Sequence, residues 1–328
     1  MTIQITIIGL GQIGASAGLA LAKYPERAQR VGYDRVLATQ NKAKELGALD
    51  TAKFSLPSAI EGADVVLLCI PFDQVEETLK LIALDLREDA VVVDFSPLKQ
   101  KTHQWFQQHV PAGRHYVGLV PAVNPWFLDQ KERGIEAASA DLFKDATLGI
   151  AVPNGTSSDA LKLAADLVGL LGGQAIFLDM LEADGMLMTA HLLPQVISAA
   201  LLNATVGQPG WTEARRFAGR PYHQSASALG ADNLEALLEA LLHNPQAATA
   251  ALDNAIGALT HMRAAIEKGD REDLQHRLEL AFSDRETWLS ERQKAQWGGP
   301  EDKPAGPKSA DLFKRLFMGG MGKDKGKK

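Results

Sequence analysis

Three glycines near the start of the chain have the spacing of a motif that binds phosphate groups. Gly9, Gly11 and Gly14 follow a run of isoleucines and precede the alanine-rich segment 15–23, an order that indicates strand, tight turn and helix. In such a unit the first glycine permits the turn, the second lets a diphosphate approach the backbone, and the third lets the helix pack closely on the strand. Free N–H groups at the start of the helix bind the anion. The motif therefore predicts a dinucleotide site.

An acidic residue stands where such a site requires one. Asp34 ends a second short run, residues 30–33, and lies 20 residues after Gly14. A carboxylate at this place accepts hydrogen bonds from the ribose hydroxyls of NAD, whereas the neighbouring Arg35 would pair with the 2′-phosphate of NADP if the acid turned away. We expect NAD as the cofactor, and NADP stays an alternative.

The wider pattern predicts the fold that positions this site. Apolar runs typical of buried parallel strands recur along the first half of the chain, at residues 63–70, 90–94, 116–120, 147–152 and 174–178. Helical segments between them indicate an α/β fold with a doubly wound parallel Rossmann-type sheet. Ligands bind beyond the carboxyl ends of such strands, so the segments that follow them should line one crevice. The predicted cofactor-binding residues are Gly9, Gly11, Gln12, Ile13, Gly14, Asp34, Arg35, Ile70 and Pro71.

From about residue 181 helical periodicity replaces the alternation. Helices are predicted at residues 183–206, 234–243, 246–267 and 271–296. Asn244 and Pro245 mark the start of one helix, and Gly269 ends it just before Asp270, which is placed to cap the next. These patterns predict a dinucleotide-binding domain at 1–179, an all-helical substrate and dimerisation domain at 180–297, and a disordered basic tail at 298–328.

Composition narrows the classes of partner. Because the helical half is so apolar, we expect it to bury surface against a second copy of the chain and so to form a homodimer. In the alternative, the helices pack only on the first domain. The chain has 328 residues and a formal charge of −6, which argues against nucleic acid as a partner. Polar residues within and beside 186–206 argue against a membrane span, and the first residues lack the pattern of a signal peptide. We expect a cytoplasmic protein without a metal site.

Oxidation of an alcohol by a nicotinamide cofactor needs a base near the hydroxyl group. Polar residues recur at intervals of seven, four and three along one predicted helix: Asp184, His191, Gln195 and Ser198. This stripe predicts either ligand contacts in a cleft or a structural hydrogen-bond network. Two crevice loops add Ser96 and Asn124, which would bond the substrate or the nicotinamide amide, or simply cap the next element. The predicted catalytic residues are His191, Ser96, Asn124 and Gln195.

A cluster of arginines predicts the kind of substrate. Arg215, Arg216 and Arg220 lie near glycines and Pro221. Arginines fixed near a loop suit bidentate recognition of a carboxylate, while a solvated surface is the alternative for each. We expect a small-molecule carboxylate as substrate.

With these motifs placed, the chain resembles the prephenate and arogenate dehydrogenase family of tyrosine biosynthesis over about residues 3–297. The resemblance rests on the glycine motif, on Gly32-Tyr33-Asp34-Arg35, and on segments 64–71, 94–99, 117–121 and 191–195. It implies a nucleotide-binding domain joined to a helical dimerisation domain. It also implies oxidative decarboxylation of prephenate or arogenate with NAD or NADP.

The chain departs from the family pattern where the chemistry lies. Segment 94–99 has Ser96 one position earlier than the serine of Asp-x-Gly-Ser-x-Lys, and Val120 replaces the histidine of Gly-x-His-Pro-Met. Against Ser-His-Leu-Pro-His, segment 191–195 moves the histidine by one position, a rotation of about 100° on a helix. The arginine that binds the carboxylate in the family has no clean counterpart in residues 222–229. Two alternatives follow: a related NAD(P)-dependent dehydrogenase for another hydroxy acid or cyclic substrate, or a catalytically silent nucleotide-binding dimer.

Overall fold

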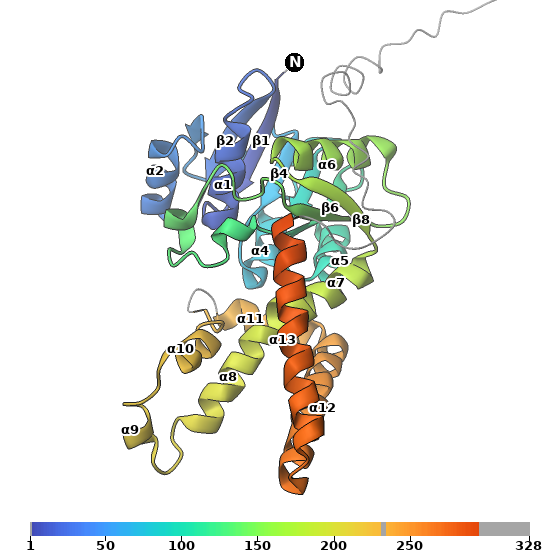
Figure 1. The fold of residues 1–328 in the computed structure, drawn as a ribbon. Helices are drawn as coiled ribbons and strands as arrows, with labels where there is room; N and C mark the ends of the chain where they lie inside the picture. Colours follow the sequence, from blue (N-terminus) through green and yellow to red (C-terminus); the bar gives the residue numbers. More distant parts are fainter. Residues whose placement is uncertain (1, 231–233, 295–328) are drawn as a thin grey trace, which may run out of the picture.

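The computed structural model describes residues 2–230 and 234–294, so the predicted tail at 298–328 lies outside the described residues. A sheet covered by helices forms one part of the molecule, and long helices extend from it to form the other (Figure 1).

Within the described residues the strands form one eight-stranded sheet of order β3-β2-β1-β4-β5-β6-β7-β8. The strands are β1 Ile3–Ile8, β2 Ala28–Tyr33, β3 Thr51–Ala52, β4 Val65–Leu68, β5 Val91–Asp94, β6 His115–Pro121, β7 Thr147–Ala151 and β8 Gln174–Leu178. Neighbouring strands are parallel, as in the pairing of Ile5 with Val65, except that β7 is antiparallel to β6. The predicted Rossmann-type class is confirmed, and this one pairing differs from the prediction.

The connection between β6 and β7 explains the reversed direction. It contains only the short turns η2 Pro125–Phe127 and η3 Gly134–Ala137, without a crossover helix. A parallel neighbour requires a crossover to the opposite edge of the sheet, whereas an antiparallel one can begin where the previous strand ended. The chain therefore enters β7 from the edge at which β6 finishes.

Alternation along the central strands builds one core on each face of the sheet. Val65 and Leu67 belong to the first core, whereas Val66 and Leu68 belong to the second. The first core is covered by α1 Gln12–Leu21, α2 Leu37–Glu45 and α6 Ser158–Leu170, and the second by α3 Leu56–Ile60, α4 Val75–Ile82 and α5 Lys99–His109. The second core also contains Met188 and Leu192. The helical part of the molecule is thus packed on the sheet domain.

The helical part begins with one long segment that changes type along its length. The predicted helix at 183–206 is α7 Met180–Leu187, the π-helical turn η4 Met188–Leu192 and α8 Leu193–Thr205. The remaining helices are α9 Trp211–Ala214, α10 Arg220–Ala226, α11 Leu234–His243, α12 Pro245–Lys268 and α13 Arg271–Lys294. The predicted signals at both ends of α12 and at the start of α13 are confirmed: Asn244 Oδ1 accepts from the N–H of Ala247, Gly269 has φ +66°, and Asp270 Oδ1 accepts from the N–H of Asp273. The short helices α9 and α10 were not predicted, and the predicted end of the last helix at residue 296 lies outside the described residues.

Much apolar surface of the helical part is uncovered within a single chain. By length and composition alone, the segment Met180–Thr205 is long and apolar enough to cross a membrane. Core helices of soluble proteins meet the same criterion. Only 17% of the most apolar stretch of this segment is buried. On α12 and α13, Leu259 and Phe282 are more than 60% exposed. Surface of this kind is typical of helices that pack against a second subunit.

Candidate functional site

The three glycines of the loop after β1 differ in their surroundings. Gly9 has φ +88°, and a Cβ there would lie 2.4 Å from the carbonyl oxygen of Cys69. A Cβ on Gly14 would lie 1.9 Å from the carbonyl oxygen of Gly9, so this residue permits the close packing of α1. A Cβ on Gly11 would meet nothing within 4 Å. The turn, the open approach and the close packing agree with the predicted geometry of a diphosphate-binding loop.

The start of α1 leaves backbone donors for an anion. Gly11 is the N-cap residue and provides no side-chain cap, so the first N–H groups of α1 are not bonded by a capping side chain. Ile13 is half-buried against the first core, and the Gln12 side chain turns sideways, donating from Nε2 to Gln130 Oε1 and to the carbonyl oxygen of Ala137, both at 3.3 Å. The residues present therefore fit a dinucleotide, held by backbone groups rather than by the Gln12 side chain.

Asp34 links the end of β2 to the glycine loop. Its Oδ2 accepts from the N–H of Leu10 and its Oδ1 from the N–H of Val36, each at 2.8 Å. A carboxylate oxygen can accept more than one hydrogen bond, so these contacts leave acceptor capacity for a ribose hydroxyl. Arg35, the residue of the NADP alternative, is exposed beside it.

The segment after β4 completes this side of the crevice. A Cβ on Gly9 would lie 2.8 Å from Cγ2 of Ile70, so Ile70 packs directly against the glycine loop. Pro71 follows as the N-cap of the short turn η1 Phe72–Gln74. The sheet thus brings together the predicted segments at 9–14, 34–35 and 70–71, although they are distant in sequence.

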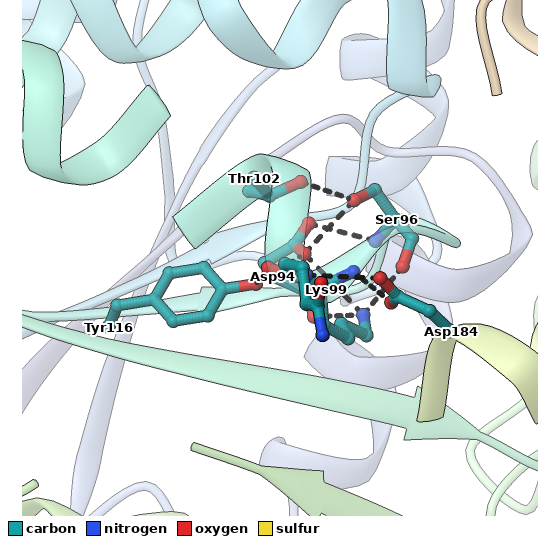
Figure 2. Close-up of polar contacts among 7 residues, drawn as sticks. Asp94, Ser96, Lys99, Thr102, Tyr116 and Asp184 are labelled. Carbon is teal, nitrogen blue, oxygen red and sulfur yellow. Dashed lines mark hydrogen bonds and ion pairs between the residues drawn. The ribbon is translucent and has the colours of Figure 1, made fainter. Parts of the chain in front are cut away.

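A buried polar network lies beside this crevice, where β5 passes into α5 (Figure 2). Its centre is Lys99, whose ammonium group donates to the carbonyl oxygens of Asp94 (2.8 Å) and Ser96 (2.6 Å) and lies 3.5 Å from Asp94 Oδ2. Tyr116 donates its hydroxyl hydrogen to Asp94 Oδ2 at 3.0 Å. A Cβ on Gly118 would lie 2.7 Å from Cδ of Lys99, so this glycine makes room for the lysine.

Asp184 connects the network to the helical part of the molecule. Its Oδ1 accepts from the N–H of Lys99 at 2.5 Å and its Oδ2 from the N–H of Gln100 at 3.3 Å, so α7 caps the start of α5. Burial raises the pKa of Asp184 to about 6, although these two N–H groups oppose the shift. Burial also lowers the pKa of Lys99, and the Asp94 carboxylate opposes that change. The network holds the two parts of the molecule together.

Ser96 belongs to this network rather than to the open crevice. The side chain is 2% exposed, and its hydroxyl donates to Asp94 Oδ2 at 2.9 Å and lies 3.0 Å from Thr102 Oγ1. The predicted contact with substrate finds no support in this geometry. Asn124 also makes a structural hydrogen bond: its Oδ1 accepts from the N–H of Trp126 at 3.1 Å and so caps η2.

The predicted polar stripe on the long helical segment is divided. Asp184 and Ser198 are buried, and Ser198 accepts from the N–H of Leu229 and donates to the carbonyl oxygen of Ala226. His191 is exposed, because the π-helical turn η4 changes the rotation per residue between the two ends of the stripe. The prediction of one shared face for the four residues is therefore wrong, and its buried members form structural bonds.

His191 itself lies within the π-helical turn. Its imidazole has no hydrogen-bond partner among the described residues, and nearby protein atoms desolvate it enough to lower the pKa of His191 although the side chain is exposed. Gln195 donates from Nε2 to the backbone carbonyl oxygen of His191 at 3.0 Å. The arrangement offers a neutral imidazole that can accept a proton.

The arginine cluster is exposed. Arg215 and Arg216 follow α9 and Arg220 begins α10. α9 lies at the far end of α8, and α10 lies beside α8 (Figure 1). An open pocket of about 610 Å³ lies nearby, with Trp211 and Tyr222 in its wall, and none of the predicted cofactor-binding or catalytic residues lines it. The structure does not bring this cluster to the glycine loop.

The sheet order, the glycine loop and the acid at the end of β2 define a dinucleotide-binding protein of the Rossmann class. Residues 17–177 match the family described as "Prephenate dehydrogenase, nucleotide-binding domain", and residues 182–280 match "Prephenate dehydrogenase, dimerization domain". The chain therefore belongs to the prephenate dehydrogenase family. It is an NAD(P)-dependent oxidoreductase that resembles prephenate dehydrogenase, and it carries the family's dimerization domain.

Relatives agree with this assignment. The chain is 26% identical to cyclohexadienyl dehydrogenase of Zymomonas mobilis over 269 residues, 81% of this chain and 89% of that protein. It is 25% identical to prephenate dehydrogenase of Bacillus subtilis over 274 residues, 82% of this chain and 72% of that protein.

Solved structures show the same fold. Prephenate dehydrogenase from A. aeolicus, in complex with hydroxyphenyl propionate and NAD+, has a TM-score of 0.76 at 20% identity, covering 88% of this chain and 98% of that one. Synechocystis arogenate dehydrogenase has a TM-score of 0.68 at 22% identity, covering 87% and 100%.

Proposed function

We propose that this protein oxidatively decarboxylates prephenate or arogenate, with NAD as the hydride acceptor. The observation that carries the proposal is the match of both family domains on a chain whose glycine loop is shaped for a diphosphate. The open space at Gly11 would receive the diphosphate, and Asp34 would accept hydrogen bonds from the adenosine ribose. When bound, the nicotinamide supplies the hydride acceptor.

The proposed base is His191. In this reaction the ring hydroxyl loses its proton as its carbon gives up hydride, and the ring carboxylate leaves as carbon dioxide. A neutral imidazole accepts that proton, and the lowered pKa of His191 keeps it neutral near pH 7. Gln195 would hold the backbone at His191 through its bond to the carbonyl oxygen.

The π-helical turn supports this role for a histidine that the sequence places one position too early. A π turn closes hydrogen bonds between residues five apart, so it accommodates one extra residue. In a regular α-helix the same insertion would rotate the residues beyond it about the helix axis. In this chain the turn spans Met188–Leu192, where the pattern Ser-His-Leu-Pro-His would gain one residue between histidine and proline. The inserted residue would then leave His191 on the face that an uninterrupted helix gives the family histidine.

Ser96 and Asn124 take supporting roles in this proposal. Ser96 helps to fix Asp94 and the start of α5, and Asn124 fixes the loop after β6. Val120 is half-buried in β6 where the family pattern has a histidine, so it contributes neither a proton acceptor nor a hydrogen bond. That replacement favours the second candidate, a dehydrogenase of the same type for another hydroxy acid.

The dimerization-domain match and the exposed apolar surface of α12 and α13 support a homodimer. We propose a domain boundary near residue 179, and its support is that the last strand, Gln174–Leu178, is followed directly by α7; the boundary proposed at residue 297 lies outside the described residues. A cytoplasmic location stays an expectation.

The test is a screen of NAD and NADP reduction by the purified full-length protein with prephenate, arogenate and a panel of hydroxy acids. We expect NADH formation with prephenate or arogenate. Turnover of a different hydroxy acid alone would select the second candidate, and the absence of any reduction with every substrate would overturn both.

A further inference from the structure

The connection between β6 and β7 crosses the carboxyl edge of the sheet before the chain turns back. It leaves β6 after Pro121, and its turn η3 contacts α1 and α2, the helices that follow β1 and β2. In the sheet β6 stands three places from β1, so a segment that joins the end of β6 to the start of α1 passes the ends of β5 and β4. Rossmann-type sheets bind dinucleotides at this edge. The connection therefore lies across the cofactor crevice.

Both ends of this connection are fixed by hydrogen bonds. Near the end of α13, Arg292 donates from Nη2 to the carbonyl oxygen of Val123 at 2.9 Å, a contact between residues 169 positions apart. At the other end, the N–H of Ser139 donates to the buried Oγ of Ser16 in α1 at 2.9 Å. Phe143, a few residues further on, is fully buried in the first core. These anchors leave the middle of the connection as the part that can move.

The middle of the connection, residues 128–136, is called the strap here and is exposed for most of its length. Gln12 Nε2 donates to Gln130 Oε1 at 3.3 Å, which is long for a hydrogen bond. Glu136 lies 3.8 Å from Lys42 Nζ, an exposed ion pair of the kind that contributes little to stability. Exposed backbone with few buried apolar contacts opens at low cost in free energy. The strap is therefore held in place weakly.

The strap also reaches the helical part of the molecule. A Cβ on Gly230 would lie 3.3 Å from Nη1 of Arg133, so this arginine lies against the segment that leads to α11. α11 in turn packs on η1, the turn that follows Pro71 in the crevice. The strap thus contacts the glycine loop through Gln130 and the helical part through Arg133, on opposite sides of the crevice.

We propose that the strap is a gate for the dinucleotide: it opens to admit the cofactor and closes over the diphosphate, fastened by the contact between Gln12 and Gln130. Gln12 is the first residue of α1, so this contact lies beside the N–H groups that bind the diphosphate. The exposed strap residues lie on the solvent side of that position. The inference concerns exchange of the cofactor and holds for any substrate that the enzyme oxidises.

A gate differs from a direct ligand contact in its kinetics. The contact between Gln12 and Gln130 forms without cofactor, and a gate closes in the same way over bound cofactor. Loosening it should therefore speed both entry and release of the cofactor and leave the Kd nearly unchanged. A residue that binds the cofactor directly would instead raise the Kd through faster release alone.

Stopped-flow fluorescence measures association and dissociation of NADH on the full-length protein without substrate. Gln130→Ala removes the acceptor for Gln12 Nε2, and both rate constants should rise by about 2- to 10-fold. Gln108→Ala, at an exposed glutamine of α5, is the matched control and should retain both parent rate constants.

Gly134 provides a second variant of the strap. It has φ +58°, and a Cβ there would meet nothing within 4 Å, so an added methyl group strains only the backbone of the closed strap. Gly134→Ala should therefore also speed both entry and release. Gly134→Asn should speed them less, because asparagine tolerates the left-handed region better than alanine does.

Two results would overturn the gate. Faster release of NADH alone in Gln130→Ala would make Gln130 a direct cofactor contact. Parent rate constants in both Gln130→Ala and Gly134→Ala would show that the strap does not limit exchange. Because the measurements contain no substrate, a protein that fails to turn over prephenate or arogenate can still show the gate, so this test is separate from that of the proposed reaction.

Discussion

Lys99 is a buried cation whose ammonium group is occupied by oxygen atoms of its own loop. Its bonds to the carbonyl oxygens of Asp94 and Ser96 leave it as a structural centre rather than a ligand for substrate. Lysine is seldom fully buried without such partners. The network fixes where β5 ends and α5 begins, and through Asp184 it also fixes α7, the helix that leads to His191.

Removing the imidazole of His191 should reduce turnover with little effect on folding. General-base catalysis is worth about 10²- to 10⁴-fold, so His191→Ala should lower kcat by that order while the affinity for NAD stays unchanged. The exposed His261 on α12 offers a matched control, and His261→Ala should retain the parent kcat.

The pH profile gives an independent check on the same residue. The base must be neutral to act, and the pKa of His191 lies below its ordinary value of 6.5. The parent kcat/KM should therefore stay level as pH falls to that value and decline only below it, when the imidazole becomes protonated. An unchanged kcat in His191→Ala would show that another group accepts the proton.

Asp184 predicts a measurable pH dependence of stability. Folding raises the pKa of its carboxyl group from 3.8 to about 6, so the folded protein binds this proton more tightly than the unfolded chain does. The group's contribution to the free energy of unfolding is therefore largest below about pH 4 and decreases as pH rises to about 6, by on the order of 3 kcal/mol.

Asp184→Asn removes this titration while keeping Oδ1 as an acceptor for the N–H of Lys99. Urea denaturation of both proteins across this pH range should give a difference in free energy of unfolding that changes with pH. Two parallel stability curves would show that Asp184 titrates alike in the folded and unfolded protein.

Among the structural elements, the glycine loop allows two similar substitutions to be compared, and we expect one to weaken NAD binding and the other to destabilise the fold. Gly11→Ala places its methyl group in open space, so the free energy of unfolding should change by less than about 1 kcal/mol while the Kd for NAD rises at least about tenfold. Gly14→Ala places its methyl group against the carbonyl oxygen of Gly9, which must displace α1 and destabilise the fold by about 1 to 3 kcal/mol or more.

Calorimetry with NAD and chemical denaturation of both variants measure the two effects. Unchanged NAD affinity in Gly11→Ala would mean that the diphosphate does not approach the loop at this residue.

Most elements were predictable because their signals are local. Continuous apolar runs such as Val65–Leu68 identify buried strands, and the glycine spacing identifies the turn into α1. The direction of β7 was not predictable, since the run Thr147–Ala151 has the same pattern in either direction. The π-helical turn was also missed, because apolar residues continue through Met188–Leu192 and one extra residue leaves no mark in a short periodic pattern.

The buried network and Arg292 needed the structure for a different reason. Lys99 appeared in the sequence as a polar residue opening a helix, and a lysine is ordinarily expected at the surface. Two residues gave a signal in the sequence: Gly118 lies within an apolar strand, and Asp94 ends another. Both contact Lys99, but they belong to different strands, and the sequence does not show that these strands are neighbours. Arg292 meets Val123 across 169 positions, and no periodicity records such a contact.

At the scale of the whole molecule, α12 presents an apolar stripe that fits a second copy of the chain. Ile256, Leu259 and Ile266 are each more than half exposed and recur at intervals of three and seven, which places them on one helix face. Leu259→Asp should shift the protein from dimer towards monomer in light scattering after size exclusion. Asn254→Asp adds the same charge on another face of α12 and should leave the dimer intact. A dimer equally stable in both variants would place the interface on other helices.

In the proposed reaction, cofactor reduction and decarboxylation occur together on this chain. The most direct measurement is the stoichiometry of the two products when the purified full-length protein acts on prephenate or arogenate with NAD, with carbon dioxide and NADH quantified in the same reaction. For the proposed reaction we expect equal amounts of both products, and loss of both in His191→Ala. A folded protein that binds NAD but forms neither product from either substrate would contradict it.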